Sequence, residues 1–362
     1  MTVCLLLQAP GYPTILSDCL VTTTGQGRGF TPSDWFIYEP GRIKPAALVG
    51  KSIRLDGRSV VSFAGRQDRI LKLLPDLEQN FPLFRLADPD RPMRRVAAFV
   101  EDFNSGAASA DEEVSALGFT ASGANGVHKV NPLLRVMQQV PTRRFGPCAA
   151  IGSGSRELLR WIDEFDRDFA FEGDEPPGNL DLVCAVGALN ATKFFGQEQD
   201  PTWGGCLQAT IYGIEEQAFY AAPDWAYCGF VLNLTDTGCE GGWMGKIVLV
   251  WTRGPDTFVR WQAHDGDQAM GHTWRIASGL GERPDDASTE DGGDFSARFA
   301  TVVWRVFYRD KSWDRITTLN GHLMAHLKLC FADDGSIKWD LDHDYIRSVA
   351  TEELAHGRER FG

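Results

Sequence analysis

The chain has 362 residues, enough for one large domain or two of ordinary size, and 43% of them are hydrophobic, which is ample for a packed core. A formal net charge of -13 argues against a nucleic-acid or anionic-membrane partner, because both need a basic face. No apolar run reaches the length of a transmembrane helix, and we recognise no targeting segment, so we expect a cytoplasmic protein. The eight cysteines form no CxxC pair and are expected to be buried free thiols.

Two β-hairpins are predicted near the start of the chain. Short apolar runs at 3–7 and 14–18 flank a Gly-Tyr-Pro turn. A second pair of runs, at 51–55 and 59–63, is joined by Asp56-Gly57, a dipeptide that supplies the positive φ angles of a tight turn. Strands therefore come in pairs in this region.

A helix and two loops follow the second hairpin. Apolar residues within 69–80 recur at helical spacing. The Pro- and Asp-rich stretch 88–92 and the small residues of 104–111 are typical of surface loops.

A strand, a turn and two helices are predicted further along. The apolar run 148–151 leads through Gly152-Ser153-Gly154-Ser155 into an amphipathic helix at 156–169. A second apolar helix is expected at 180–195, and a strand at 206–212. Paired strands with long helices segregated from them indicate an α+β layered domain.

The remainder of the chain, 216–362, is predicted to be a mostly β extension. Most tryptophans fall here, within strand-like runs such as 299–308, and 332–336 has the composition of a hairpin turn. His322 and His326 are four positions apart, the spacing at which two histidines on a helix can bind one metal ion. The leucines around them favour a strand, in which this spacing does not indicate a metal site. We therefore expect no metal or cofactor.

Polar residues that suit catalysis occur at particular intervals in the first part of the chain. Asp18 lies 16 positions after Thr2, and Lys51 lies 14 positions before Gly65. Ser153 lies in the glycine-rich turn. Asp200 opens an Asp-x-x-x-Gly-Gly motif before the strand at 206–212.

In this order and at these intervals, the residues resemble the proteasome β-subunit and its bacterial relatives, which are N-terminal-nucleophile (Ntn) hydrolases. The resemblance covers about 2–215. It implies a four-layer αββα sandwich over that range, followed by the β extension at 216–362, and it implies a threonine-type peptidase.

The chemistry of such a peptidase asks for these residue types. A small second residue favours removal of the initiator Met, so Thr2 is expected to carry both the nucleophilic hydroxyl and a free α-amine as its base. The unperturbed pKa of that amine is about 8, which suits neutral pH. A neighbouring lysine, Lys51, lowers the pKa of amine and hydroxyl, and Asp18 pairs with the lysine and fixes it.

Further site residues are implied by the resemblance alone. The backbone N–H of Gly65 would serve the oxyanion hole, where a missing side chain lets a carbonyl approach closely. Ser153 and Asp200 would hydrogen-bond around the threonine amine. Thr22 and Phe63 would contact the substrate.

Three features depart from the family pattern. The 29 positions from Thr22 to Lys51 exceed the family's usual dozen or so, which predicts a loop inserted near the substrate cleft. Trp203 stands where the family commonly has serine or threonine, which removes one hydrogen bond to the amine. A ring as large as that of Phe63, pointing towards the substrate pocket, predicts a shallow pocket.

The resemblance also implies partners. We expect a peptide or unfolded protein as substrate, assembly into a homo-oligomeric ring, and possible supply by an ATP-dependent unfoldase. Two alternatives stay open: an Ntn amidohydrolase that acts on a small amide, and a catalytically silent scaffold subunit. Retention of Thr2, Asp18 and Lys51 together favours an active site.

Overall fold

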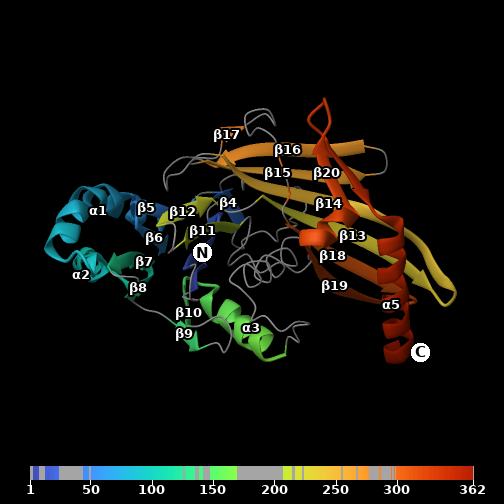
Figure 1. The fold of residues 1–362 in the computed structure, drawn as a ribbon, viewed down its shortest axis with the longest axis horizontal. Coiled ribbons are helices and arrows are strands. Elements are labelled where there is room, and N and C mark those ends of the chain that lie inside the picture. The colour runs from blue at the N-terminus through green and yellow to red at the C-terminus, as the bar shows by residue number, and fades with distance from the viewer. Residues whose placement is uncertain are drawn as a thin grey trace. The chain divides into compact units, whose positions relative to one another are not determined.

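The computed structural model of the chain describes residues 3–7, 13–23, 44–48, 50–124, 127–134, 138–141, 147–168, 207–213, 217–221, 224–253, 256–265, 268–276, 285–286, 295, 297 and 299–361. Contacts divide the chain into two compact units. The first consists of Met1–Val186, Asp200–Ala222 and Ile276–Pro284, and the second of Gly187–Gln199, Pro223–Arg275 and Asp285–Gly362. Both units mix helices and strands (Figure 1).

A six-stranded antiparallel sheet in the first unit contains both strands of the first predicted hairpin. Its strand order is β12-β11-β2-β1-β10-β9. The strands are β1 Cys4–Leu7, β2 Thr14–Asp18, β9 Gln138–Pro141, β10 Pro147–Ile151, β11 Leu207–Gly213 and β12 Ala218–Ala221. The hairpin of β1 and β2 is confirmed, as are the strands predicted at 148–151 and 206–212.

A four-stranded antiparallel sheet, in the order β5-β6-β7-β8, contains the second predicted hairpin. Its strands are β5 Ser52–Asp56, β6 Ser59–Ala64, β7 Ser115–Ala124 and β8 Val127–Leu134. The hairpin is confirmed, but Gly57 is not among the described glycines with positive φ. Instead the Asp56 carboxylate accepts a hydrogen bond of 2.8 Å from the backbone N–H of Arg58, which shapes the turn through the side chain. A separate two-stranded sheet pairs β3, Leu20–Thr23, with β4, Lys44–Leu48.

Two helices cover one face of the four-stranded sheet. Helix α1, Gln67–Ala87, extends beyond the predicted 69–80, and α2, Pro92–Ser105, was not predicted at all. Apolar side chains of both helices form one buried core with alternate residues of the strands, such as Val61 and Phe63. A short 3-10 helix, η1 at Ala110–Glu112, leads from α2 to β7.

The other face of the four-stranded sheet packs against the six-stranded sheet. Because side chains alternate along a strand, β1 and β6 each send every second residue into this core. The buried residues of this core come from both sheets: Cys4, Leu6, Ile15, Val60, Ala64, Leu117, Phe119, Ala121, Ala149, Ile151 and Tyr212.

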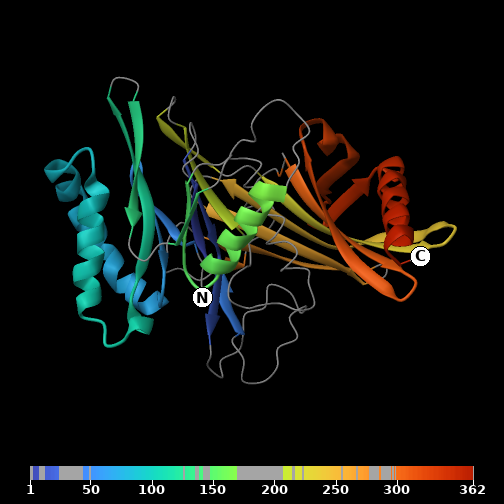
Figure 2. The same cartoon turned by 90° about the horizontal axis from the view of Figure 1, so that it is seen from below.

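Helix α3, Ser155–Asp168, contacts β9 and β10 of the six-stranded sheet, close to the predicted 156–169. Figure 2 shows the first unit from below, with α1 and α2 beside β7 and β8, and with α3 beside the strands of the other sheet. The second predicted helix, 180–195, lies outside the described residues. The four-layer αββα sandwich expected for 2–215 stays a prediction.

The second unit is built on a seven-stranded sheet with the order β17-β16-β15-β14-β13-β18-β19. Strand β18 runs parallel to β13, and the other pairs for which a register is described are antiparallel. The strands are β13 Trp225–Thr235, β14 Gly238–Arg253, β15 Asp256–Asp265, β16 Gln268–Ile276, β17 Asp285–Asp286, β18 Phe299–Tyr308 and β19 Lys311–Asn320.

One face of this sheet packs against α5, His343–Phe361, a C-terminal helix that was not predicted within the mostly β extension. The hairpin of β20, Leu327–Phe331, and β21, Ile337–Leu341, is confirmed, with its turn at 332–336. The prediction of a strand around His322 and His326 was wrong. Both lie in a 3-10 helix, η2 at Gly321–His326, and His326 Nδ1 contacts Asp342 Oδ2 at 3.0 Å.

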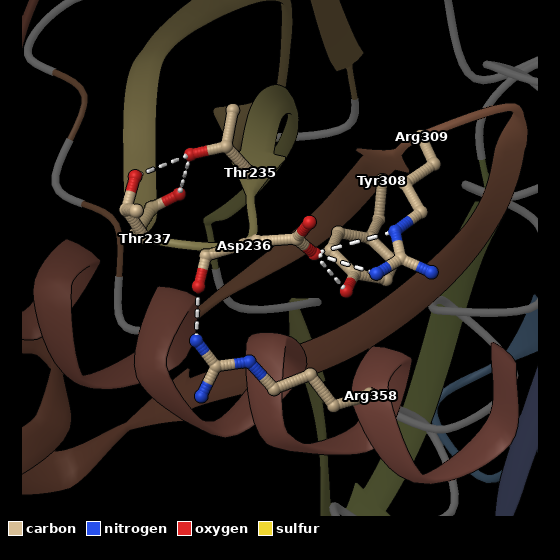
Figure 3. A network of polar contacts seen from close by, with 7 residues as sticks. Thr235, Asp236, Thr237, Tyr308, Arg309 and Arg358 are labelled. Atoms are coloured by element: carbon tan, nitrogen blue, oxygen red, sulfur yellow. Dashed lines mark hydrogen bonds and ion pairs between the residues drawn. The ribbon is translucent and has the colours of Figure 1, made fainter. Parts of the chain in front are cut away.

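A polar network joins the turns of this sheet to α5 (Figure 3). Asp236, in the turn between β13 and β14, accepts hydrogen bonds from the Tyr308 hydroxyl at 2.6 Å and from Arg309 Nη2 at 2.9 Å. Arg358 of α5 donates to the backbone carbonyl of Asp236. One exposed aspartate thereby ties together two turns and a helix.

None of the helices that the structure describes has the length and apolarity needed to cross a membrane.

Candidate active site

A buried ion pair joins the two sheets of the first unit. Lys51 Nζ lies 2.7 Å from Asp18 Oδ1, with the two side chains 4% and 0% exposed. Asp18 ends β2, whereas Lys51 lies immediately before β5. Two charges removed from water in this way are tolerated because each is the partner of the other.

The same carboxylate holds the start of β1. The backbone N–H of Val3 donates to Asp18 Oδ1 at 2.8 Å, and the backbone N–H of Asp18 donates to the Val3 carbonyl at 3.0 Å. One carboxylate oxygen therefore accepts from both Val3 and Lys51. Thr2, the residue before Val3, lies outside the described residues.

Gly65 follows β6 directly, in a conformation that requires glycine. Its φ is 138°, and a Cβ built on it would lie 2.9 Å from the carbonyl oxygen of Glu113. Both the backbone angle and the lack of space exclude a side chain. The backbone carbonyl of Lys51 accepts a hydrogen bond of 3.1 Å from the Phe63 N–H, which ties the lysine to the strand that precedes Gly65.

A set of small polar side chains beside the ion pair was not predicted from the sequence. Ser17 Oγ lies 3.1 Å from Ser52 Oγ, and Ser52 in turn contacts Ser62. The sequence signal for this set is Ser17, which lies two positions after the inward-facing Ile15 of β2 and so shares its face.

The Cys4 thiol lies in the same region and is fully buried. Burial raises its pKa well above the ordinary range, Lys51 opposes this, and the charge of Asp18 adds to it. The thiol therefore stays protonated at neutral pH. Since the thiolate is the nucleophilic form, Cys4 is unsuited to nucleophilic chemistry.

Phe63 does not lie as expected. Its side chain is fully buried in the core formed with α1 and α2, on the face of β6 opposite to Ser62. The ring therefore fills the helix-covered core and does not point into an open substrate pocket.

The other predicted site residues are only partly placed. Ser153 is exposed in the turn between β10 and α3, where Gly152 has a φ of 97°. Thr22 lies in β3 opposite Pro45 of β4. Asp200 and Trp203 lie outside the described residues, as does most of the predicted inserted loop. The structure thus brings together Asp18, Lys51 and the start of β1.

Metal ligands do not gather in the described part of the chain. There, no group of three or more His, Cys, Asp or Glu residues could hold a metal ion. The described site offers an ammonium, a carboxylate, backbone N–H groups and the serine hydroxyls beside them.

Comparison with known proteins finds distant similarity to solved structures and no other match. A scan against models of protein families finds no match, and a search of curated proteins finds none. Among solved structures, the chain is similar to eukaryotic HslV from Trypanosoma brucei, with 13% identity and a TM-score of 0.35. The match covers 58% of this chain and 98% of the HslV chain. At this TM-score the similarity establishes neither a family nor an activity.

Proposed function

We propose that the first unit is an Ntn hydrolase of the threonine peptidase type, with Thr2 as its nucleophile once Met1 is removed. The observation that carries this proposal is the shared oxygen of Asp18, which accepts from Lys51 Nζ at 2.7 Å and from the Val3 N–H at 2.8 Å. It brings a buried ammonium to the start of the strand that Thr2 precedes.

The arrangement of the first unit supports the same proposal. Two sheets face each other across an apolar core, with α1 and α2 against one sheet and α3 against the other. This packing is what an αββα sandwich over about 2–215 requires. Strand β12, Ala218–Ala221, still belongs to its six-stranded sheet, so the proposed extension begins after that strand.

In the proposed reaction, the Thr2 amine takes the proton of the Thr2 hydroxyl, and the hydroxyl oxygen attacks the substrate carbonyl. The Gly65 N–H stabilises the tetrahedral oxyanion. The peptide C–N bond breaks as the ammonium of Thr2 returns the proton to the leaving amine, which leaves an ester on Thr2. Water, deprotonated by the same amine, then hydrolyses the ester and restores the free hydroxyl.

Lys51 and Asp18 have distinct parts in this scheme. A positive charge near the Thr2 amine disfavours its protonated form, so more of the amine is available as a base at neutral pH. Asp18 fixes the lysine and the Val3 N–H on a single oxygen and so sets their distance. Peptide substrates, a homo-oligomeric ring, a cytoplasmic location and an ATP-dependent unfoldase belong to the same proposal.

Hydrolysis by the full chain and its Thr2 variants tests the proposal. A panel of fluorogenic peptides and small amides is assayed with the wild type, Thr2→Ser, Thr2→Ala and Thr351→Ala, an exposed helical threonine that serves as the control. We expect Thr2→Ala to abolish hydrolysis, Thr2→Ser to retain part of it and the control to match the wild type. Activity on small amides alone would favour the amidohydrolase, and activity that survives Thr2→Ala would overturn the proposal.

A further inference from the structure

Four small polar side chains form a square between the two sheets of the first unit. Cys4 and Ser17 are opposite one another on β1 and β2, and Ser52 and Ser62 are opposite one another on β5 and β6. Ser17 Oγ reaches Ser52 Oγ at 3.1 Å across the space between the sheets, Ser52 contacts Ser62, and the Cys4 thiol donates to the backbone carbonyl of Phe63, the residue after Ser62. We call these four residues the polar square.

The surroundings of the polar square are apolar. Leu6, Ile15, Val60 and Leu117 occupy inward positions of the same two sheets. Cys4, Ser17 and Ser62 are each fully buried. A buried hydroxyl destabilises an apolar core unless it is hydrogen-bonded. The hydroxyls of the square are therefore a specific structural feature and do more than occupy space.

Hydrogen bonds hold the square together at Cys4 and at Ser52. The Cys4 thiol lies 3.6 Å from the Phe63 carbonyl, which can only accept, so the thiol donates to it. The Ser52 hydroxyl contacts both Ser17 and Ser62, and in each contact either oxygen can be the donor. Losing the Ser52 hydroxyl therefore removes both contacts.

Each member of the square lies close in sequence to one proposed catalytic residue. The pairs are Cys4 with Thr2, Ser17 with Asp18, Ser52 with Lys51, and Ser62 with Gly65. In two of these pairs the residues are adjacent, so two neighbouring bridges, Ser17 to Ser52 and Asp18 to Lys51, join the same two segments.

We propose that the polar square is a positioning device, in which Ser52 and Ser62 fix the distance between the segments that carry the nucleophile, the ion pair and the oxyanion N–H. This inference rests on the proposed function, because the residues that the square positions are those of the proposed reaction. Ser52 and Ser62 act through Lys51, Asp18 and Gly65, and contact no substrate.

The test uses the full chain and four variants. Ser52→Ala and Ser62→Ala each remove one hydroxyl of the square, and Ser52→Thr restores a hydroxyl. Ser59→Ala is the matched control, because Ser59 is also fully buried on β6 and also hydrogen-bonded, to Thr120 at 3.0 Å. For each protein, the rate at which a threonine-directed epoxyketone adds to Thr2 is measured between pH 5 and pH 10, alongside hydrogen exchange at the Val3 amide.

We expect Ser52→Ala and Ser62→Ala to slow adduct formation by about tenfold or more, because small displacements of catalytic groups have effects of this size. The pH midpoint should rise, since a displaced Lys51 lowers the amine pKa less. Ser52→Thr should recover most of the rate, and Ser59→Ala should keep the wild-type rate and midpoint. Equal rates and midpoints in Ser52→Ala, Ser62→Ala and Ser59→Ala would overturn the inference.

The exchange measurement separates this inference from the proposed function. If the wild type forms no adduct, the proposed function fails. Hydrogen exchange at the Val3 amide then tests whether the polar square holds the site in place. Faster exchange at Val3 in Ser52→Ala and Ser62→Ala, but not in Ser59→Ala, would uphold the square as the element that holds this site. Unchanged exchange in all three variants would overturn it.

Discussion

Asp18 Oδ1 and Lys51 Nζ lie 2.7 Å apart in the core of the first unit, and this contact joins the last residue of a strand in one sheet to the residue before a strand in the other. The carboxylate oxygen also receives the Val3 N–H. The pair therefore connects the end of β2, the start of β5 and the start of β1. The proposed nucleophile, Thr2, is the residue before Val3 in the sequence.

Removing one charge of this pair should destabilise the first unit. Asp18→Asn keeps an acceptor for the Val3 N–H but leaves the Lys51 ammonium buried without its carboxylate. Breaking a buried pair in this way costs about 3–5 kcal/mol. Hydrogen exchange of peptides that cover β1, β2 and β5, followed in increasing denaturant, measures the loss.

Two comparisons make that prediction specific. The double variant Asp18→Asn/Lys51→Met should lose less than the sum of the single variants, because the buried charge is then absent. Asp68→Asn is the control, since Asp68 pairs with Arg66 in an exposed bridge in which both side chains are 53% exposed. An effect of Asp18→Asn no larger than that of Asp68→Asn would contradict the account.

Gly65→Ala should damage both the stability and the proposed oxyanion site. A φ of 138° is open to glycine almost alone, and the new Cβ would meet the Glu113 carbonyl at 2.9 Å. We expect a loss of about 1–3 kcal/mol from the backbone alone. Gly57→Ala is the matched control, because nothing lies within 4 Å of its Cβ position. Thermal unfolding measured on both variants checks the prediction, and equal losses would refute it.

The Cys4 thiol should resist alkylation in the native protein. Burial raises its pKa above the ordinary range, so almost no thiolate is present at pH 8. Cys239 and Cys330 are exposed, and we expect iodoacetamide to modify these two first. Peptide mapping after a short reaction measures the order. Early modification of Cys4 would show that the region around the ion pair opens to solvent.

Lys246 gives the second unit a pH-dependent stability. It lies on β14, where burial and then the charge of Arg305 lower its pKa from 10.5 to about 8. Between these values the unfolded chain binds the proton and the folded chain does not, so the stability contributed by this group rises with pH from about 8 to 10.5.

Lys246→Met should remove this rise and stabilise the second unit at pH 7. The side chain is half-buried, so solvent screening reduces the gain to about 1 kcal/mol. Tryptophan fluorescence during urea unfolding, at pH 7 and at pH 10, measures the difference between variant and wild type. A difference that is the same at both pH values would contradict the prediction.

The paired strands could be predicted from the sequence because alternation and turn residues are local signals. Helix α2 was missed because Pro92 and the acidic residues before it were interpreted as a loop, although proline suits the first turn of a helix and Met93, Val96 and Val100 follow at helical spacing. Helix α5 was missed because 216–362 was interpreted as mostly β, although the Asp342 carboxylate accepts from the Asp344 N–H, as the N-cap residue of a helix does.

The candidate site was predictable only in part. Asp18 and Lys51 were paired because their intervals resemble those of a family, and nothing in their local sequence places them together. The polar square could not be predicted, because it depends on the register of two strand pairs and on which faces of two sheets meet. Phe63 was assigned to a pocket because its place in the motif was known but the face of β6 that it occupies was not.

Mass spectrometry of the full chain after reaction with a threonine-directed epoxyketone tests the central claim most directly. We expect that the protein has lost Met1 and gains one adduct per chain, that peptide mapping places the adduct on Thr2, and that Thr2→Ala gains none. A retained Met1, or an adduct that persists in Thr2→Ala, would contradict it.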